Sequence, residues 1–154
     1  MGVRDFKDLV CWQLSYQLKR EVFAFTASGP VSRDFKYCDQ IRDSSSSAPR
    51  NIAEGFGRFR PAEFGRFLSY ARESLIETRN HLRDGRDSGY LSERECSRLS
   101  NLARAAERAT TNLMLAKQRQ ASEEKKKKRG RAPSRGRGEV FYAVNPDGTL
   151  KRQT

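Results

Sequence analysis

The sequence is poor in the residues that build metal centres and covalent catalytic sites. Its 154 residues hold one histidine and three cysteines, Cys11, Cys38 and Cys96, which are widely spaced and form no CxxC pair. Zinc sites and Cys–His nucleophilic pairs need such residues at defined spacings. His81 falls on the face of its predicted helix opposite the apolar stripe, so we expect it to be solvated. These absences argue against a metal, a cofactor and an enzyme activity.

Long apolar runs are also missing. No segment approaches the roughly 20 apolar residues that cross a bilayer. Charged residues follow Met1 where a secretory signal would have an apolar run. An odd number of scattered thiols is typical of a reducing compartment. We therefore expect a cytoplasmic protein without a membrane partner.

Acidic residues are outnumbered. The chain holds 31 Lys and Arg against 19 Asp and Glu, which gives a net charge of +12 and a pI of about 10.1. This balance favours polyanionic partners, namely RNA, DNA or an acidic protein surface. Residues 1–118 hold 20 basic and 15 acidic residues, whereas residues 119–154 hold 11 and 4. We place a domain boundary between these two segments.

Helical periodicity is what the sequence has in abundance. Apolar residues recur at steps of three or four in four segments, at about 5–27, 32–54, 61–82 and 92–116. The connections are short and no convincing strand pattern precedes residue 138. This predicts an all-α domain over 1–118, an up-and-down antiparallel four-helix bundle. We expect a kink at Pro49 and close helix packing at the neighbouring serines.

The stretch "NIAEGFGRFRP" at 51–61 joins the second and third predicted helices. It has two glycines but lacks the lysine and preceding strand of a phosphate-binding loop, so we interpret it as a corner. Gly55 is predicted to close the second helix in the left-handed conformation, with Gly57 as a second permissive position. Arg58 and Arg60 are candidate phosphate contacts. For Glu54, an arginine pair or a cap is favoured over acid–base catalysis.

A row of arginines lies beside the apolar stripe of the third helix. At 100° per residue, four side chains align about 80° from that stripe: Arg72, Arg79, Arg83 and Arg86. One interpretation is a nucleic-acid contact ridge. The other is a row whose heads pair with acids on the next helix or subunit. The sequence does not decide between them.

The C-terminal segment changes character after Lys117. Residues 119–137 contain no apolar side chain larger than alanine, so we expect 119–154 to be mostly disordered, with a short strand near 139–144. Eight cations in thirteen residues suit sequence-independent phosphate binding. The alternatives are a solvated charge run and a membrane-surface or localisation signal, but no apolar face accompanies the cations. These cations are Lys125, Lys126, Lys127, Lys128, Arg129, Arg131, Arg135 and Arg137.

Residues 5–82 resemble a known family. The stretches "DFKDLVCWQLSYQLKREVF", "QIR" at 40–42, "NIAEGFGR" at 51–58 and "FGRFLSYARESLIETRNHL" at 64–82 are similar to the four-helix bundle proteins encoded in intervening sequences of bacterial 23S ribosomal RNA genes. That family is similar in architecture to the Avd accessory proteins of diversity-generating retroelements. The chain differs from it in Ser44–Ser47, where Ala and Val prevail, and in its basic extension.

The resemblance implies a ring-like homopentamer without enzymatic activity, and Avd relatives bind nucleic acid and a reverse transcriptase through a basic surface. Asn51 and Glu54 fit interhelical hydrogen bonding, whereas Phe56 and Phe59 fit a subunit interface. We expect a non-enzymatic, oligomeric bundle that binds RNA or DNA, with a reverse transcriptase as a candidate partner. The alternative is a scaffold that docks an acidic protein.

Overall fold

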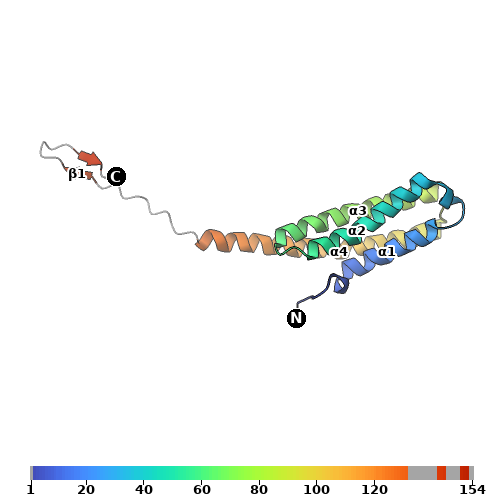
Figure 1. Cartoon of the computed structure of the whole chain (residues 1–154), viewed down its shortest axis with the longest axis horizontal. Helices are drawn as coiled ribbons and strands as arrows, with labels where there is room; N and C mark the ends of the chain where they lie inside the picture. The colour runs from blue at the N-terminus through green and yellow to red at the C-terminus, as the bar shows by residue number, and fades with distance from the viewer. Residues whose placement is uncertain (1, 132–141, 145–149, 153–154) are drawn as a thin grey trace. The chain divides into compact units, whose positions relative to one another are not determined.

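The structure confirms the four-helix bundle. The computed structural model describes residues 2–131, 142–144 and 150–152. Figure 1 shows the helices lying side by side and joined by short connections. The helices are α1 (Val10–Thr26), α2 (Phe35–Phe56), α3 (Pro61–Asp87) and α4 (Glu93–Arg131), with short 3-10 helices η1 (Phe6–Asp8) and η2 (Pro30–Arg33) before α1 and α2.

The chain divides into two units after Ser122. Within the second unit, the strands β1 (Tyr142–Val144) and β2 (Leu150–Arg152) pair antiparallel. The strand expected near 139–144 corresponds to β1, and residues 139–141 lie outside the described residues.

Local signals in the sequence fix the helix ends. The Asp34 carboxylate accepts the Tyr37 N–H at 3.1 Å and caps α2, and Pro61 occupies the first turn of α3, where a missing N–H costs nothing. The Ser92 hydroxyl caps α4 by accepting a backbone N–H at 3.1 Å. Gly29, with φ of 76°, follows the end of α1 in the left-handed region that glycine tolerates.

The apolar stripes meet in two buried clusters. The larger draws on all four helices and includes Leu18, Ile41, Leu75 and Leu99. The smaller lies around Ile52 and the start of α3, with Phe64 and Leu68. Burial of these side chains provides the main driving force that holds the four rods together.

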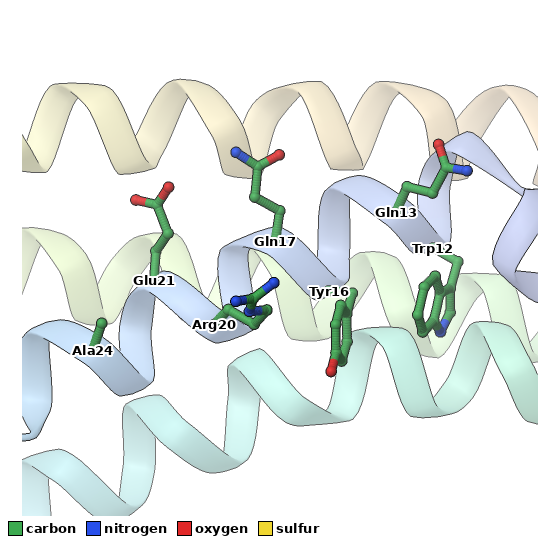
Figure 2. A pocket seen from close by; sticks show the side chains of 7 residues that line it. All are labelled: Trp12, Gln13, Tyr16, Gln17, Arg20, Glu21 and Ala24. Atoms are coloured by element: carbon green, nitrogen blue, oxygen red, sulfur yellow. The ribbon is translucent and has the colours of Figure 1, made fainter.

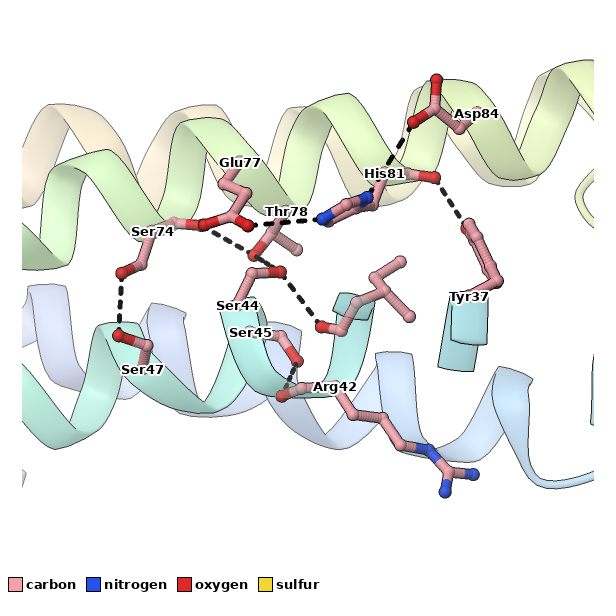
Figure 3. A network of polar contacts seen from close by, with 11 residues as sticks. Tyr37, Arg42, Ser44, Ser45, Ser47, Ser74, Glu77, Thr78, His81 and Asp84 are labelled. Atoms are coloured by element: carbon pink, nitrogen blue, oxygen red, sulfur yellow. Dashed lines mark hydrogen bonds and ion pairs between the residues drawn. The ribbon is translucent and has the colours of Figure 1, made fainter. Parts of the chain in front are cut away.

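The α2–α3 contact has a polar seam in its centre, which we call the hydroxyl seam: Ser44, Ser47, Ser74 and Thr78. Thr78 Oγ1 donates to Ser44 Oγ at 3.0 Å and Ser74 Oγ donates to Ser47 Oγ at 2.9 Å (Figure 3). Small hydroxyls let the two backbones approach closely, as the serine run predicted. The predicted kink does not break α2, which runs through Pro49 without interruption.

Two helices are longer than predicted. The apolar periodicity predicts a third helix only to residue 82, yet α3 continues to Asp87 with Gly85 buried inside it. A Cβ at Gly85 would collide with the Tyr37 hydroxyl, which donates to the His81 carbonyl at 2.6 Å. The glycine thus serves helix packing rather than a turn.

The expectation of disorder from residue 119 is wrong for 119–131, which is the end of α4. No glycine or proline stands between Glu93 and Arg129, so nothing in the chain stops the helix. Glu123 and Glu124 also precede Lys127 and Lys128 by four residues, the favourable order for ion pairs along a helix.

Candidate nucleic-acid interface

The glycines of the α2–α3 corner do not have the role that their positions suggested. Gly55 lies inside α2 and is buried, and neither Gly55 nor Gly57 has a positive φ. A Cβ on Gly55 would stand 2.7 Å from Phe67 Cβ and 2.8 Å from Phe64 Cδ2. Close approach of α3, not a left-handed turn, therefore requires glycine at Gly55. This corrects the predicted helix-closing role.

Polar residues of the corner bind within their own segment. Asn51 Nδ2 donates to the Ser47 carbonyl at 2.9 Å and to Ser47 Oγ at 3.0 Å, so its hydrogen bonds stay within α2 rather than crossing to another helix. Glu54 pairs with Arg58 at 2.9 Å one turn away. The Arg58 guanidinium also lies 5.0 Å from the centre of the Phe67 ring. Arg58 is thus occupied on one side by a carboxylate and on the other by a ring.

The two phenylalanines of the corner have different surroundings. Phe56 packs against the smaller core cluster and meets Phe64 edge-on at 6.2 Å, so it belongs partly to the interior of its own subunit. Phe59 is fully exposed. Arg60, beside it, is also exposed and precedes the first turn of α3. Only Phe59 retains the open position expected of a subunit contact.

The predicted arginine row of α3 faces α4. Arg79, Arg83 and Arg86 line a cleft of about 270 Å³ together with Arg104 of α4, and Arg72 lines an adjoining one with Arg104 and Arg108. We call these six side chains the arginine cleft. Sequence reasoning missed its α4 half. The sequence signal was only partial: Arg104 and Arg108 stand four residues apart and so share one exposed face of α4, but that face lies away from the buried Ala106, and no local pattern places it beside α3.

Some of these arginines have carboxylate partners. Arg79 Nη1 lies 3.3 Å from Glu107 Oε1, and Arg86 Nη1 lies 3.5 Å from Glu93 Oε2. A hydrogen bond to Asp87 and the charge of Glu93 raise the pKa of Arg86 above its usual value. The pairing with the next helix that the sequence left open therefore holds for two of the four α3 arginines.

The other cations of the cleft have no such partner. Among residues 2–131, no ion pair is formed by Arg72, Arg83, Arg104 or Arg108, and Arg104 has only a 3.4 Å contact to Asn101 Oδ1. Hydroxyl and amide groups of Ser97, Ser100 and Asn101 line the same cleft. Neighbouring free guanidiniums beside neutral hydrogen-bonding groups are suited to an anion.

The C-terminal cations continue α4. The side chains of Lys125, Lys126, Lys127, Lys128 and Arg129 are all exposed, and Arg131 ends the helix. Arg135 and Arg137 lie outside the described residues. The described part of the basic run is thus a helix rather than the disordered tail expected from its composition.

A second hollow follows α1. It has a volume of about 550 Å³ and no counterpart in the sequence-based candidates. Figure 2 shows Gln13, Gln17 and Glu21 on one side of the helix and Trp12 and Tyr16 on the other. The two aromatic rings stack 4.7 Å apart. The lining also includes Arg20 and Glu21, one charge of each sign, so it does not share the excess positive charge of the arginine cleft.

His81 is not solvated, in contrast to the expectation. Its side chain is 14% exposed, because Glu77 and Asp84 lie along it at 3.5 and 3.9 Å from its two ring nitrogens (Figure 3). Among the described residues, no group of three or more His, Cys, Asp or Glu side chains is placed so that it could hold a metal ion. Over the same part of the chain, no helix is both long and apolar enough to cross a membrane.

Comparison with known proteins identifies related sequences and folds. The sequence model of the family described as 23S rRNA-intervening sequence protein matches residues 7–112. No curated protein matches the chain. The chain is similar to the crystal structure of a protein with unknown function from the S23 ribosomal protein family of Bacteroides thetaiotaomicron VPI-5482. The two sequences are 18% identical, and the aligned region covers 68% of this chain and 98% of that chain with a TM-score of 0.62. At this identity the likeness shows the fold alone.

Proposed function

The chain belongs to the 23S rRNA-intervening sequence protein family, and from this premise we propose that it is a non-enzymatic, homo-oligomeric bundle that binds RNA or DNA. In this proposal, arginine and lysine side chains contact backbone phosphates rather than bases. The net charge of +12 supplies the long-range attraction. Its three cysteines are free and buried, which is compatible with the reducing cytoplasm where we place it.

The arginine cleft is the observation that carries this proposal. Six guanidiniums face only two carboxylates, Glu93 and Glu107, among the residues that line its two hollows. Leaving like charges close together costs free energy unless an anion offsets them. Guanidinium groups bind phosphate oxygens through two parallel hydrogen bonds, so a phosphate backbone along α3 and α4 would supply the missing acceptors.

A second candidate is a scaffold that docks an acidic protein. The Arg79–Glu107 pair favours it, because the same cleft already accepts a carboxylate at 3.3 Å. A partner with closely spaced Asp and Glu side chains would then take the place of phosphates. Such a partner offers point contacts rather than a uniformly charged strand, so its binding should weaken less with salt.

Assembly is the third element of the proposal. Phe59 and Phe35 are large apolar side chains with 103% and 76% of their surface exposed, and Val10 on α1 is 60% exposed. Apolar groups left in water at separate points of one small bundle favour contacts with further copies, for which we propose a pentamer. In such an assembly the protein would act as an accessory to a reverse transcriptase or another nucleic-acid enzyme.

A binding titration tests the proposal. Fluorescence anisotropy of labelled single-stranded RNA, duplex RNA and duplex DNA is measured between about 50 and 200 mM salt. We expect micromolar or tighter binding at low salt, with affinity falling steeply as salt rises. A polyglutamate peptide serves as the matched acidic competitor. Absence of nucleic-acid binding at low salt, with the peptide still bound, would reject the proposal in favour of the acidic-partner scaffold.

A further inference from the structure

The basic run at the end of α4 is distinct from the arginine cleft. The family match ends at residue 112, so this segment lies outside the part of the chain shared with the family. Residues 122–130 are all exposed. Successive residues of an α-helix are rotated by about 100°, so Lys125 to Arg129 place cations around the whole circumference of the helix. Their charge points in every direction instead of along one face.

This arrangement limits the kind of partner. Residues 122–130 read "SEEKKKKRG" and contain no apolar side chain. A helix that lies on a membrane, or in the groove of a protein, needs an apolar stripe on one side. A helix with cations all around instead fits where negative charge stands on two opposite sides. Duplex nucleic acid offers that environment between its two phosphate backbones.

Groove dimensions decide between the two kinds of duplex. An α-helix with its side chains is about 10–12 Å across, and the major groove of duplex DNA is about 12 Å wide. The major groove of duplex RNA is deep and too narrow for side chains to enter. We infer that residues 123–131 of α4 bind in the major groove of duplex DNA, with cations reaching phosphates on both walls. This inference rests on the proposed nucleic-acid binding and adds duplex DNA as the preferred ligand.

The continuity of α4 makes the inference testable. A helix of nine residues is marginal by itself, because nucleation is unfavourable. In this chain the segment is the last part of a 39-residue helix whose earlier turns are anchored by buried Leu99, Ala106 and Thr110. The folded bundle therefore nucleates the basic segment. A break after Ser122 should uncouple it and melt it.

The experiment compares two full-length variants of equal charge, Glu124→Pro and Glu124→Ala. Proline removes a backbone donor and clashes with the preceding turn, whereas alanine preserves the helix. Glu124 is exposed, so both variants should keep the thermal stability of the bundle. We expect E124A to bind duplex DNA more tightly than duplex RNA of the same sequence. We expect E124P to lose about tenfold in DNA affinity, a difference of about 1.4 kcal/mol, and little in RNA affinity.

A second variant tests the role of charge with the helix intact. Replacement of Lys125–Lys128 by glutamine, a good helix former, should lower duplex-DNA affinity and reduce the slope of log affinity against log salt by about 3 to 4. Equal DNA affinities of E124P and E124A would overturn the major-groove inference while leaving the proposed function standing. Binding of neither variant to any nucleic acid would instead reject the proposed function. Capture by phosphatidylserine vesicles rather than DNA would also overturn the inference.

Discussion

The two long contacts of α3 differ in how their polar groups are satisfied. Toward α2, Ser44, Ser47, Ser74 and Thr78 are paired with one another and with backbone carbonyls, and the seam is neutral. Toward α4, six arginines face two glutamates, and four of the arginines form no ion pair within residues 2–131. The first contact is complete within the chain. The second has unused donors.

This difference separates structural from functional polarity. A buried hydroxyl that already has its partner contributes to helix register and packing and has nothing left for a ligand. A cluster of cations without anions raises the energy of the free protein and lowers it again when an anion binds. The hydroxyl seam therefore contributes to the packing of α2 against α3, and the arginine cleft is the surface on which we base the proposed binding.

The largest loss of stability is expected from a substitution in the α2–α3 contact. Gly55→Ala should destabilise the bundle by about 1 to 3 kcal/mol through overpacking against Phe67 and Phe64, although alanine is the better helix former. Gly65→Ala is the matched control on the α4 side, because its Cβ would lie 3.8 Å from Lys117 Cβ in ordinary contact. It should stabilise by up to about 1 kcal/mol. Urea unfolding measures the free energy of unfolding of both variants. Equal changes in that free energy would show that the α2–α3 contact at Gly55 is no tighter than the contact of α4 at Gly65.

A smaller effect is expected within the hydroxyl seam. Thr78→Val removes the donor to Ser44 and should cost about 1 kcal/mol, since Ser44 keeps its bond to the Ile41 carbonyl. The double change S44A/T78V removes both hydroxyls and should restore most of the lost stability. A double-mutant cycle from urea unfolding measures the coupling. Additive costs would mean that the two hydroxyls contribute independently.

The smallest stability effects should come from the arginine cleft. Arg79→Gln should destabilise by about 0.5 to 1 kcal/mol, because Glu107, whose side chain is 15% exposed, loses its cation. Arg83→Gln should leave the free energy of unfolding within about 0.5 kcal/mol, since no carboxylate pairs with it among the described residues. Thermal unfolding compares them. A larger loss in R83Q than in R79Q would contradict the division into paired and free cations.

Much of this architecture follows from local sequence signals whose effect does not depend on the rest of the fold. The apolar stripes, the proline at the start of α3 and the Ser92 cap of α4 each act within one helical turn, so the sequence alone predicts them. The sequence alone does not predict which arginines of the α3 row form ion pairs, because that pairing depends on another helix. Which of Arg79, Arg83 and Arg86 meets an acid depends on the rotation of α4, which no local pattern encodes.

The errors have equally specific causes. Gly55 and Gly85 look like helix terminators, but both lie inside helices. Each is a glycine because a side chain of another helix packs so closely that a Cβ would collide with it. That reason is tertiary and leaves no local trace. The predicted disorder after residue 118 came from composition, whereas an unbroken run of helix formers attached to a folded helix continues it. Arg104 and Arg108 lie on the exposed face of α4, and their proximity to the α3 arginines depends on how the two helices pack, which no local pattern encodes.

Salt-dependent binding by two charge-matched variants tests the central claim most directly. R83Q/R104Q removes two free cations of the arginine cleft, and R4Q/R20Q removes two exposed arginines outside it. Anisotropy titrations with labelled nucleic acid should show the slope of log affinity against log salt reduced by about 2 in R83Q/R104Q, and nearly unchanged in R4Q/R20Q. Equal reductions in both variants would show that only net charge matters and would contradict the assignment of phosphate binding to the cleft.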